Sequence, residues 1–144
     1  MKRILLLAGI VMLAGCLGTQ TETTLPPKKH PSLSLQPSAE SRVLELSHLS
    51  VLLEPAFSEG LSYTTKGRLE FNPQMIPQAA VVYDFELQAI ILDEDYKVVK
   101  KFTLREFNSK NASDPIPFEF NFSLQPNYRF ITFNYGMKYF HNFT

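Results

Sequence analysis

The only cysteine of this 144-residue chain, Cys16, follows a segment with three distinct parts. Lys2 and Arg3 give the chain a positive start, residues 4–13 form an almost unbroken apolar run, and Gly15 directly precedes the cysteine. A basic start, a short apolar segment and small residues in that order are typical of a secretory signal peptide. The run is too short for a membrane-spanning helix, which needs about 20 residues.

Residues 13–16, Leu-Ala-Gly-Cys, resemble the lipobox of bacterial lipoproteins. The resemblance implies that a diacylglyceryl group is attached to the thiol of Cys16. It also implies that the signal peptide, residues 1–15, is cut off between Gly15 and Cys16, and that the new amino group is acylated, for example with palmitate. Two or three acyl chains hold a protein firmly in a membrane, whereas one holds it only marginally. The alternative is an incidental cysteine behind an ordinary signal peptide.

The residue after the cysteine bears on the destination of such a lipoprotein. In the family that the lipobox resembles, an aspartate at this position commonly retains the protein at the inner membrane. Here the residue is Leu17. The resemblance therefore implies a lipid anchor in the outer membrane of a bacterial cell envelope.

Patterns for catalysis, metal binding or nucleic-acid binding are not found elsewhere in the sequence. The histidines at positions 30, 48 and 141 are not spaced as metal ligands, and phosphate-binding and nucleophile-elbow motifs are lacking. The 14 basic and 14 acidic residues balance, whereas a nucleic-acid-binding protein normally carries a positive surface. A single cysteine excludes a disulfide within one chain and a cysteine-built zinc site. We expect no enzymatic activity, no cofactor, no metal and no nucleic-acid partner.

Two groups of acidic residues each allow more than one interpretation. Asp93, Glu94 and Asp95 indicate a solvated hairpin tip; a calcium loop would need more oxygen ligands and a glycine for its turn. Asp84 and Glu86 lie two residues apart on one face of a predicted strand. They indicate a polar outer face, unless a deep pocket holds both, which would favour a small hydrolase or carbohydrate-active enzyme.

Aromatic residues are the other candidates for a site. Phe118, Phe120 and Phe122 alternate along one predicted strand and indicate a core. Tyr128, Tyr135 and Tyr139 belong either to the same core or to a groove for a carbohydrate or a peptide, and alternation alone does not separate these two roles.

A change in composition divides the chain after the cysteine. Residues 16–41 are rich in Thr, Ser and Pro and contain no aromatic residue, whereas all 12 Phe and all 6 Tyr fall within residues 42–144. The first part predicts a disordered tether, because it offers too little apolar surface to offset the entropy of ordering it. The second part predicts one folded domain.

The periodicity of residues 42–144 predicts strands and no long helix. Six strands are expected, over residues 43–53, 61–71, 79–92, 96–107, 116–124 and 128–140. Val81, Tyr83 and Phe85 are expected to face inward on the third. Gly67 suggests a bulge or the close approach of another backbone, and Gly136 a further bulge. Short antiparallel strands at near-regular spacing predict an all-β, immunoglobulin-like sandwich of about six to seven strands.

Residues 89–99, AIILDEDYKVV, are similar to part of the FxLYD and related immunoglobulin-like domains of bacterial envelope proteins. The similarity extends over residues 66–101, although Tyr96 replaces the usual glycine. It implies the fold and no functional residue.

We therefore expect a lipid-anchored, non-catalytic binding or scaffolding module, with the membrane bound through Cys16 and another envelope protein or a glycan as partner. The alternatives are an accessory outer-membrane lipoprotein of a secretion or surface-appendage machine and, third, the small enzyme described above.

Overall fold

The computed structural model describes residues 31–140, so the signal peptide, Cys16 and most of the predicted tether lie outside the described residues. The described part contains nine strands and no helix. The strands are β1 (Leu33–Ser34), β2 (Arg42–Glu45), β3 (Leu49–Leu53), β4 (Phe57–Glu59), β5 (Ser62–Phe71), β6 (Val81–Leu92), β7 (Val98–Asn111), β8 (Ile116–Ser123) and β9 (Phe130–Phe140).

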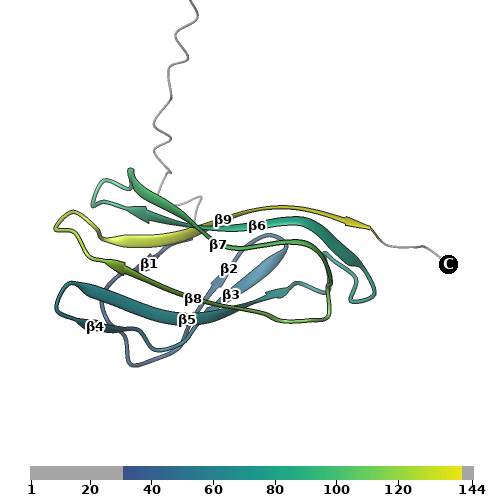
Figure 1. Cartoon of the computed structure of the whole chain (residues 1–144), viewed down its shortest axis with the longest axis horizontal. Helices are drawn as coiled ribbons and strands as arrows, with labels where there is room; N and C mark the ends of the chain where they lie inside the picture. The colour runs from purple at the N-terminus through teal and green to yellow at the C-terminus, as the bar shows by residue number, and fades with distance from the viewer. Residues whose placement is uncertain (1–30, 141–144) are drawn as a thin grey trace, which may run out of the picture.

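The strands form two antiparallel sheets that pack face to face (Figure 1). Sheet I has the order β1-β9-β6-β7. Sheet II has the order β2-β3-β5-β8, and β4 follows β3 along the same side of β5. The predicted all-β antiparallel sandwich is confirmed, with more strands than expected.

The pairing of the central strands is that of an immunoglobulin-like sandwich. In that fold one sheet has the strand order A-B-E-D and the other C-F-G, and some members add a strand beside C. Here β5 pairs with β8 as B pairs with E, and β6 pairs with β9 as C pairs with F. The additional strand beside C is β7, and the position of strand G, beside β9, is taken by β1 over two residues only.

The core between the sheets is largely aromatic. Phe118, Phe120 and Phe122 project inward from β8 and are at most 8% exposed, as their alternation predicted. Phe102 of β7 contacts this row, with ring centroids 5.9 Å from Phe120 and 5.6 Å from Phe122. Such aromatic pairs add to the stabilisation that burial gives.

Gly67 lies where three strands crowd together, as the sequence suggested. It pairs with Leu53 on one side and with Phe118 on the other. A Cβ at this position would lie 2.5 Å from the carbonyl oxygen of Leu52 and 2.6 Å from the ring of Phe118. Only glycine fits without displacing the backbone of β3.

The expected end of the tether at residue 41 is wrong. Leu33 and Ser34 form β1 on β9, Leu35 is only 4% exposed, and Ser38 pairs with Ala56. The side chain of Arg42 fixes this segment, because it donates one hydrogen bond to the carbonyl of Ser34 at 2.5 Å and another to the hydroxyl of Tyr63 at 3.0 Å. Leu35 is buried and Leu33 partly buried by contacts that the local composition did not reveal.

The single strand expected over residues 43–53 is also wrong. Ser47 and His48 interrupt it, and the chain reverses between β2 and β3 with a hydrogen bond from the Leu46 N–H to the Leu49 carbonyl at 2.9 Å. Polar residues in the middle of an apolar run are placed in a turn because burying them unpaired would be costly.

A bulge in β6 explains why Val81 and Tyr83 do not face inward as expected. The register of β6 on β9 shifts between Tyr83 and Glu86, and Asp84 has a φ of 50°. The extra residue reverses the alternation, so that Val82 is buried while Val81 is 39% exposed. The bulge expected near Gly136 therefore exists, but its extra residue lies on the partner strand.

Candidate functional site

Two of the three candidate tyrosines lie together, and the third does not. Tyr135 and Tyr139 lie on the second half of β9 and line one groove. Tyr128 precedes β9, packs against Phe122 at 6.1 Å between ring centroids, and lines a separate hollow of about 450 Å³ with Leu35. The tyrosines therefore do not form a single cluster.

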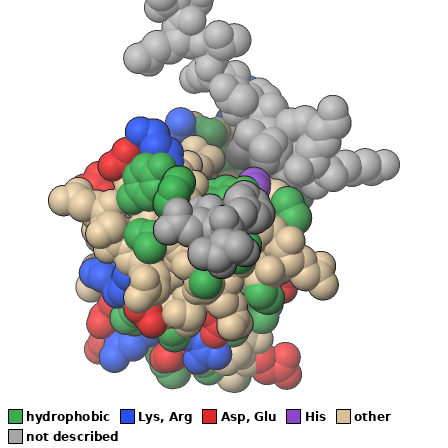
Figure 2. Space-filling model, turned by 90° about the vertical axis from the view of Figure 1, so that its right-hand side faces the viewer, with side chains coloured by type: hydrophobic (Ala, Val, Ile, Leu, Met, Phe, Trp, Pro, Cys, Tyr) green, Lys and Arg blue, Asp and Glu red, His purple; other side chains and the backbone are tan. Residues whose placement is uncertain are grey.

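The groove beside Tyr135 is larger than the hollow beside Tyr128, and several polar groups converge on it. It has a volume of about 650 Å³ and lies between the β2–β3 turn of sheet II and β9 of sheet I. It is lined by residues 45–48 and 133–137 together with Pro31 and Tyr139. Figure 2 shows the end of the sandwich toward which β9 runs, where hydrophobic side chains are exposed across the face and charged ones lie mainly along the left and lower borders.

Ser47, His48 and Tyr135 are joined by hydrogen bonds at one wall of this groove. The Tyr135 hydroxyl lies 2.7 Å from Ser47 Oγ and 2.8 Å from His48 Nδ1, and it accepts a hydrogen bond from the His48 backbone N–H at 3.2 Å. Ser47 Oγ and His48 Nδ1 are 3.0 Å apart. Because the tyrosine ties the β2–β3 turn to β9, these polar groups have fixed positions against the groove.

This cluster offers hydrogen-bonding groups to a ligand and no charge relay. A nucleophilic serine needs a histidine that is itself oriented by a third group, usually a carboxylate. The nearest acid along the chain, Glu45, instead accepts a hydrogen bond from Ser50 Oγ at 2.5 Å. Among residues 31–140, no carboxylate is hydrogen-bonded to His48. The arrangement is suited to binding.

The predicted acidic candidates lie away from the groove. Asp84, at the bulge, accepts a hydrogen bond from Lys138 Nζ at 2.8 Å on the surface, and this bond raises the pKa of Lys138 above its ordinary value of 10.5. Glu86 accepts hydrogen bonds from Gln88 Nε2 at 2.6 Å and from Thr103 Oγ1 at 3.0 Å. The two carboxylates do not face one another across a pocket.

Asp93 closes the hairpin between β6 and β7, as the sequence indicated. Its Oδ1 accepts hydrogen bonds from the backbone N–H groups of Asp95 and Lys97, both at 2.9 Å, and Tyr96 adopts a φ of 60° in the turn. No group of three or more His, Cys, Asp or Glu side chains that could hold a metal ion occurs within residues 31–140.

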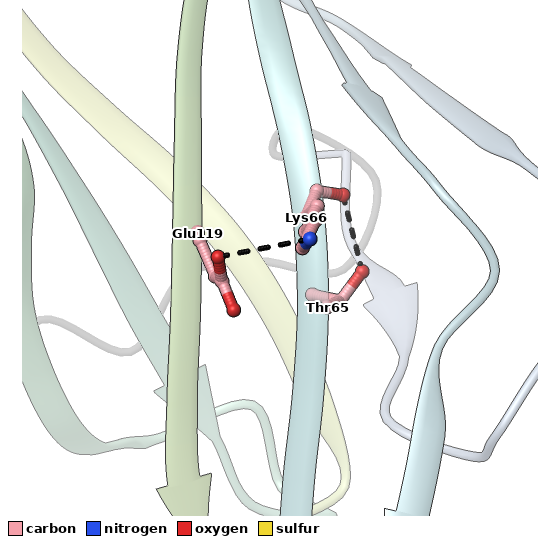
Figure 3. Close-up of polar contacts among 3 residues, drawn as sticks. All are labelled: Thr65, Lys66 and Glu119. Carbon is pink, nitrogen blue, oxygen red and sulfur yellow. Dashed lines mark hydrogen bonds and ion pairs between the residues drawn. The ribbon is translucent and has the colours of Figure 1, made fainter.

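A third, more polar hollow lies along β5 and β8. Its volume is about 430 Å³, and it is lined in part by Lys66 and Glu119, which are opposite each other in the strand pairing. Figure 3 shows Lys66 Nζ and Glu119 Oε2, 4.0 Å apart, beside the hydrogen bond that Thr65 Oγ1 donates to the Lys66 carbonyl at 3.2 Å. Both charged side chains are more than half exposed, so this ion pair contributes at most about 1 kcal/mol.

Sequence reasoning missed the polar cluster because its members are far apart in the chain: His48 and Tyr135 are separated by 87 positions. The only local signal was the Ser47-His48 pair inside an apolar run.

Residues 31–140 contain no helix that is long and apolar enough to cross a membrane. No protein-family model, curated protein or solved structure matches this chain.

Proposed function

We propose that this chain is a lipoprotein of the bacterial cell envelope, anchored in the outer membrane through acyl chains on Cys16, and that its β-sandwich is a non-catalytic binding module. The observation that carries the proposal is the order of residues 1–16: a basic start, a short apolar run and Leu-Ala-Gly-Cys. The anchor fixes the location, and the folded domain supplies the binding surface.

The layout of the chain after Cys16 supports this division of labour. Residues 17–30 include Pro26 and Pro27 and consist mainly of polar residues, a composition typical of a spacer between a membrane and a domain. The sandwich then offers a groove of about 650 Å³ with fixed hydrogen-bonding groups. A module of this kind needs a stable scaffold and a shaped surface, and no reactive centre.

Intact-mass measurement of the protein purified from native membranes tests the anchor. We expect a chain that begins at Cys16 and carries a diacylglyceryl group and a further acyl chain. The Cys16→Ser variant should keep its signal peptide or leave the membrane fraction. An unmodified thiol on a chain that retains residues 1–15 would contradict the proposal.

Binding is tested with the Cys16→Ser chain, immobilised and exposed to envelope extract and to purified peptidoglycan. We expect one component to be retained, and to be lost when Tyr135 and His48 are both replaced by alanine. It should still be retained when Lys66, in the hollow along β5 and β8, is replaced by alanine. If the variant with both groove residues replaced retains the component as well as the natural sequence does, the component binds at another surface.

A further inference from the structure

Within residues 31–140, one side of β9 has no neighbouring strand over most of its length. β1 pairs with Phe130 and Ile131, whereas β9 continues to Phe140. Among residues 31–140, no strand pairs with residues 132–140 on that side, although β6 pairs with β9 on the other. This is the position that strand G fills in an immunoglobulin-like sandwich.

The backbone of β9 is presented to a further strand there. The Leu35 N–H donates to the carbonyl of Arg129 at 2.9 Å, one residue beyond the β1 ladder. In an antiparallel ladder alternate residues direct both backbone groups to the same neighbour. The odd-numbered residues of β9, from Ile131 to Tyr139, therefore direct their N–H and C=O groups toward the side of β1.

The chain's own tether is a poor occupant of this edge. In the β1 register, where Leu33 lies opposite Ile131, Pro31 comes opposite Phe133 and Pro27 would come opposite Met137. Both are positions where the added strand must donate an N–H, and proline has none. The Pro31 carbonyl instead accepts a hydrogen bond from Thr132 Oγ1 at 2.7 Å, so the chain leaves the ladder at this point.

The groove lies directly beneath the open edge. Phe133, Tyr135, Met137 and Tyr139 are odd-numbered residues that line it, and Leu46 lies across from them. A strand added to the edge would direct every second side chain into the groove. Apolar side chains would pack against Met137 and Leu46, and a polar one would reach Ser47 and His48.

We propose that an extended segment of another envelope protein, with apolar residues at alternate positions, adds to sheet I along residues 132–140 of β9 and continues the ladder that β1 begins. This inference rests on the proposed binding function and names its surface and the kind of partner. Main-chain hydrogen bonds supply the affinity, and the groove supplies the selectivity for alternate side chains.

Site-specific photocrosslinking in the native host tests the proposal. A benzophenone amino acid replaces Asn134 or Lys138 on β9, or Lys101 on β7 as a control, and mass spectrometry locates the linked residues. We expect Asn134 and Lys138 to link to one partner segment at positions about four residues apart, because paired strands advance together. That segment should alternate apolar and other residues, and Lys101 should not link to it.

A matched pair of variants tests the backbone contribution. Met137→Pro removes one N–H at the edge, and Met137→Ala shortens the side chain but keeps that N–H. Crosslinking from Lys138 should fall about tenfold or more in the proline variant and stay within about twofold in the alanine variant. The spacing of crosslinks is measured in a chain with Met137 intact, so it decides the proposal even if Met137→Pro fails to fold.

Other results would overturn the inference. Crosslinks from Asn134 and Lys138 to residues 17–30 would show that the tether occupies the edge. Crosslinks to β9 of a second copy would show that the edge is a dimer interface. Crosslinks to unrelated segments or to glycan would exclude strand addition. If Lys101 alone links to a partner, the binding function stands and only the role of β9 fails. If no position links to any partner, both the inference and the proposed binding function fail.

Discussion

Two long stretches of sheet I have an unpaired side within the described residues, β7 and residues 132–140 of β9, and they differ in the charge that they carry. β7 is 14 residues long and pairs only with β6 within the described part of the chain. It carries five charged residues: Lys100, Lys101, Arg105, Glu106 and Lys110. β9 is 11 residues long and carries one, Lys138, whose charge is paired with Asp84.

Charge on an edge strand matters because unpaired backbone groups are a template for another strand. Lysines on an edge oppose such pairing, since an incoming strand would have to bury or displace them. β7 is protected in this way, whereas residues 132–140 of β9 offer a nearly uncharged edge above an aromatic groove. The difference supports the proposed docking at β9, because both edges are exposed but only residues 132–140 lack protecting charge beside a shaped groove.

The two strands also differ in how firmly they are held. Ile131 and Phe133 of β9 are buried between the sheets, whereas every residue of β7 is at least partly exposed. Within the described residues β9 is thus paired on both sides only at Phe130 and Ile131, and is an edge strand over residues 132–140. The proposed binding edge continues a firmly packed strand, so less conformational entropy should be lost when a partner binds to it.

The largest expected effect tests this difference in how firmly β9 and β7 are packed. Ile131→Ala should lower the free energy of unfolding by about 2–4 kcal/mol, because it leaves a cavity at a fully buried position. Leu104→Ala, at a half-buried position of β7, should cost less than about 1.5 kcal/mol. Urea denaturation followed by circular dichroism measures both, and equal losses would break the comparison.

A smaller loss is expected where β1 is attached beside β9. Arg42→Met removes hydrogen bonds to the Ser34 carbonyl and to the buried hydroxyl of Tyr63, and should cost about 1–2 kcal/mol. The amide of Leu35 should also exchange its hydrogen faster. Arg68→Met, which loses only an exposed pair with Glu70, should stay within about 0.5 kcal/mol. Equal effects of the two variants would show that Arg42 does not hold β1.

The wall of the groove comes next. Tyr135→Phe removes the hydroxyl that joins Ser47 and His48 to β9 and should cost about 0.5–1.5 kcal/mol. Tyr139→Phe is the matched control, because Tyr139 is 45% exposed and its hydroxyl makes no hydrogen bond within the described residues. Thermal unfolding measures the difference, and a Tyr139 variant as unstable as the Tyr135 variant would contradict the role assigned to the cluster.

Removing the charges from β7 should make it resemble β9. The double variant Lys100→Thr and Lys101→Thr should change stability by no more than about 0.5 kcal/mol, since both side chains are exposed. It should, however, raise self-association in light scattering, because the edge loses its protection. Lys66→Thr, on the central strand β5, should not. A double variant that stays monomeric would mean that charge is not what protects β7.

The alternation of apolar residues was sufficient to predict the sandwich and much of its core. Phe118, Phe120 and Phe122 lie where their period of two placed them, and Gly67 lies where strands crowd together. These features depend on local pattern and on the need to bury one face of each strand. They can therefore be predicted from the sequence.

The features that form the groove could not be predicted from the alternation of apolar residues. The bulge at Asp84 reverses the facing of Val81 and Tyr83, and alternation carries no sign of a single extra residue. The attachment of β1 depends on Arg42, and the polar cluster joins residues 87 apart in the chain. Tertiary contacts override local preference at all these places.

The smallest expected effect concerns the one charge on β9. Its hydrogen bond to Asp84 raises the pKa of Lys138 above 10.5, so the folded state holds this proton more tightly than the unfolded state. The resulting stabilisation is present in full below about pH 10.5 and is lost as the pH rises through the raised pKa. The difference in unfolding free energy between the natural chain and Lys138→Met should therefore stay constant up to about pH 10 and shrink as the pH rises above about 10.5.

Lys138→Arg separates this titration from other effects of high pH. Arginine can keep the bond to Asp84 and stays charged over the same range. Its advantage over Lys138→Met should then persist where that of lysine declines. If both advantages decline together, the pH dependence arises elsewhere in the chain. The charge at position 138 would then be free rather than neutralised, and β9 would have an edge protection of its own like that of β7.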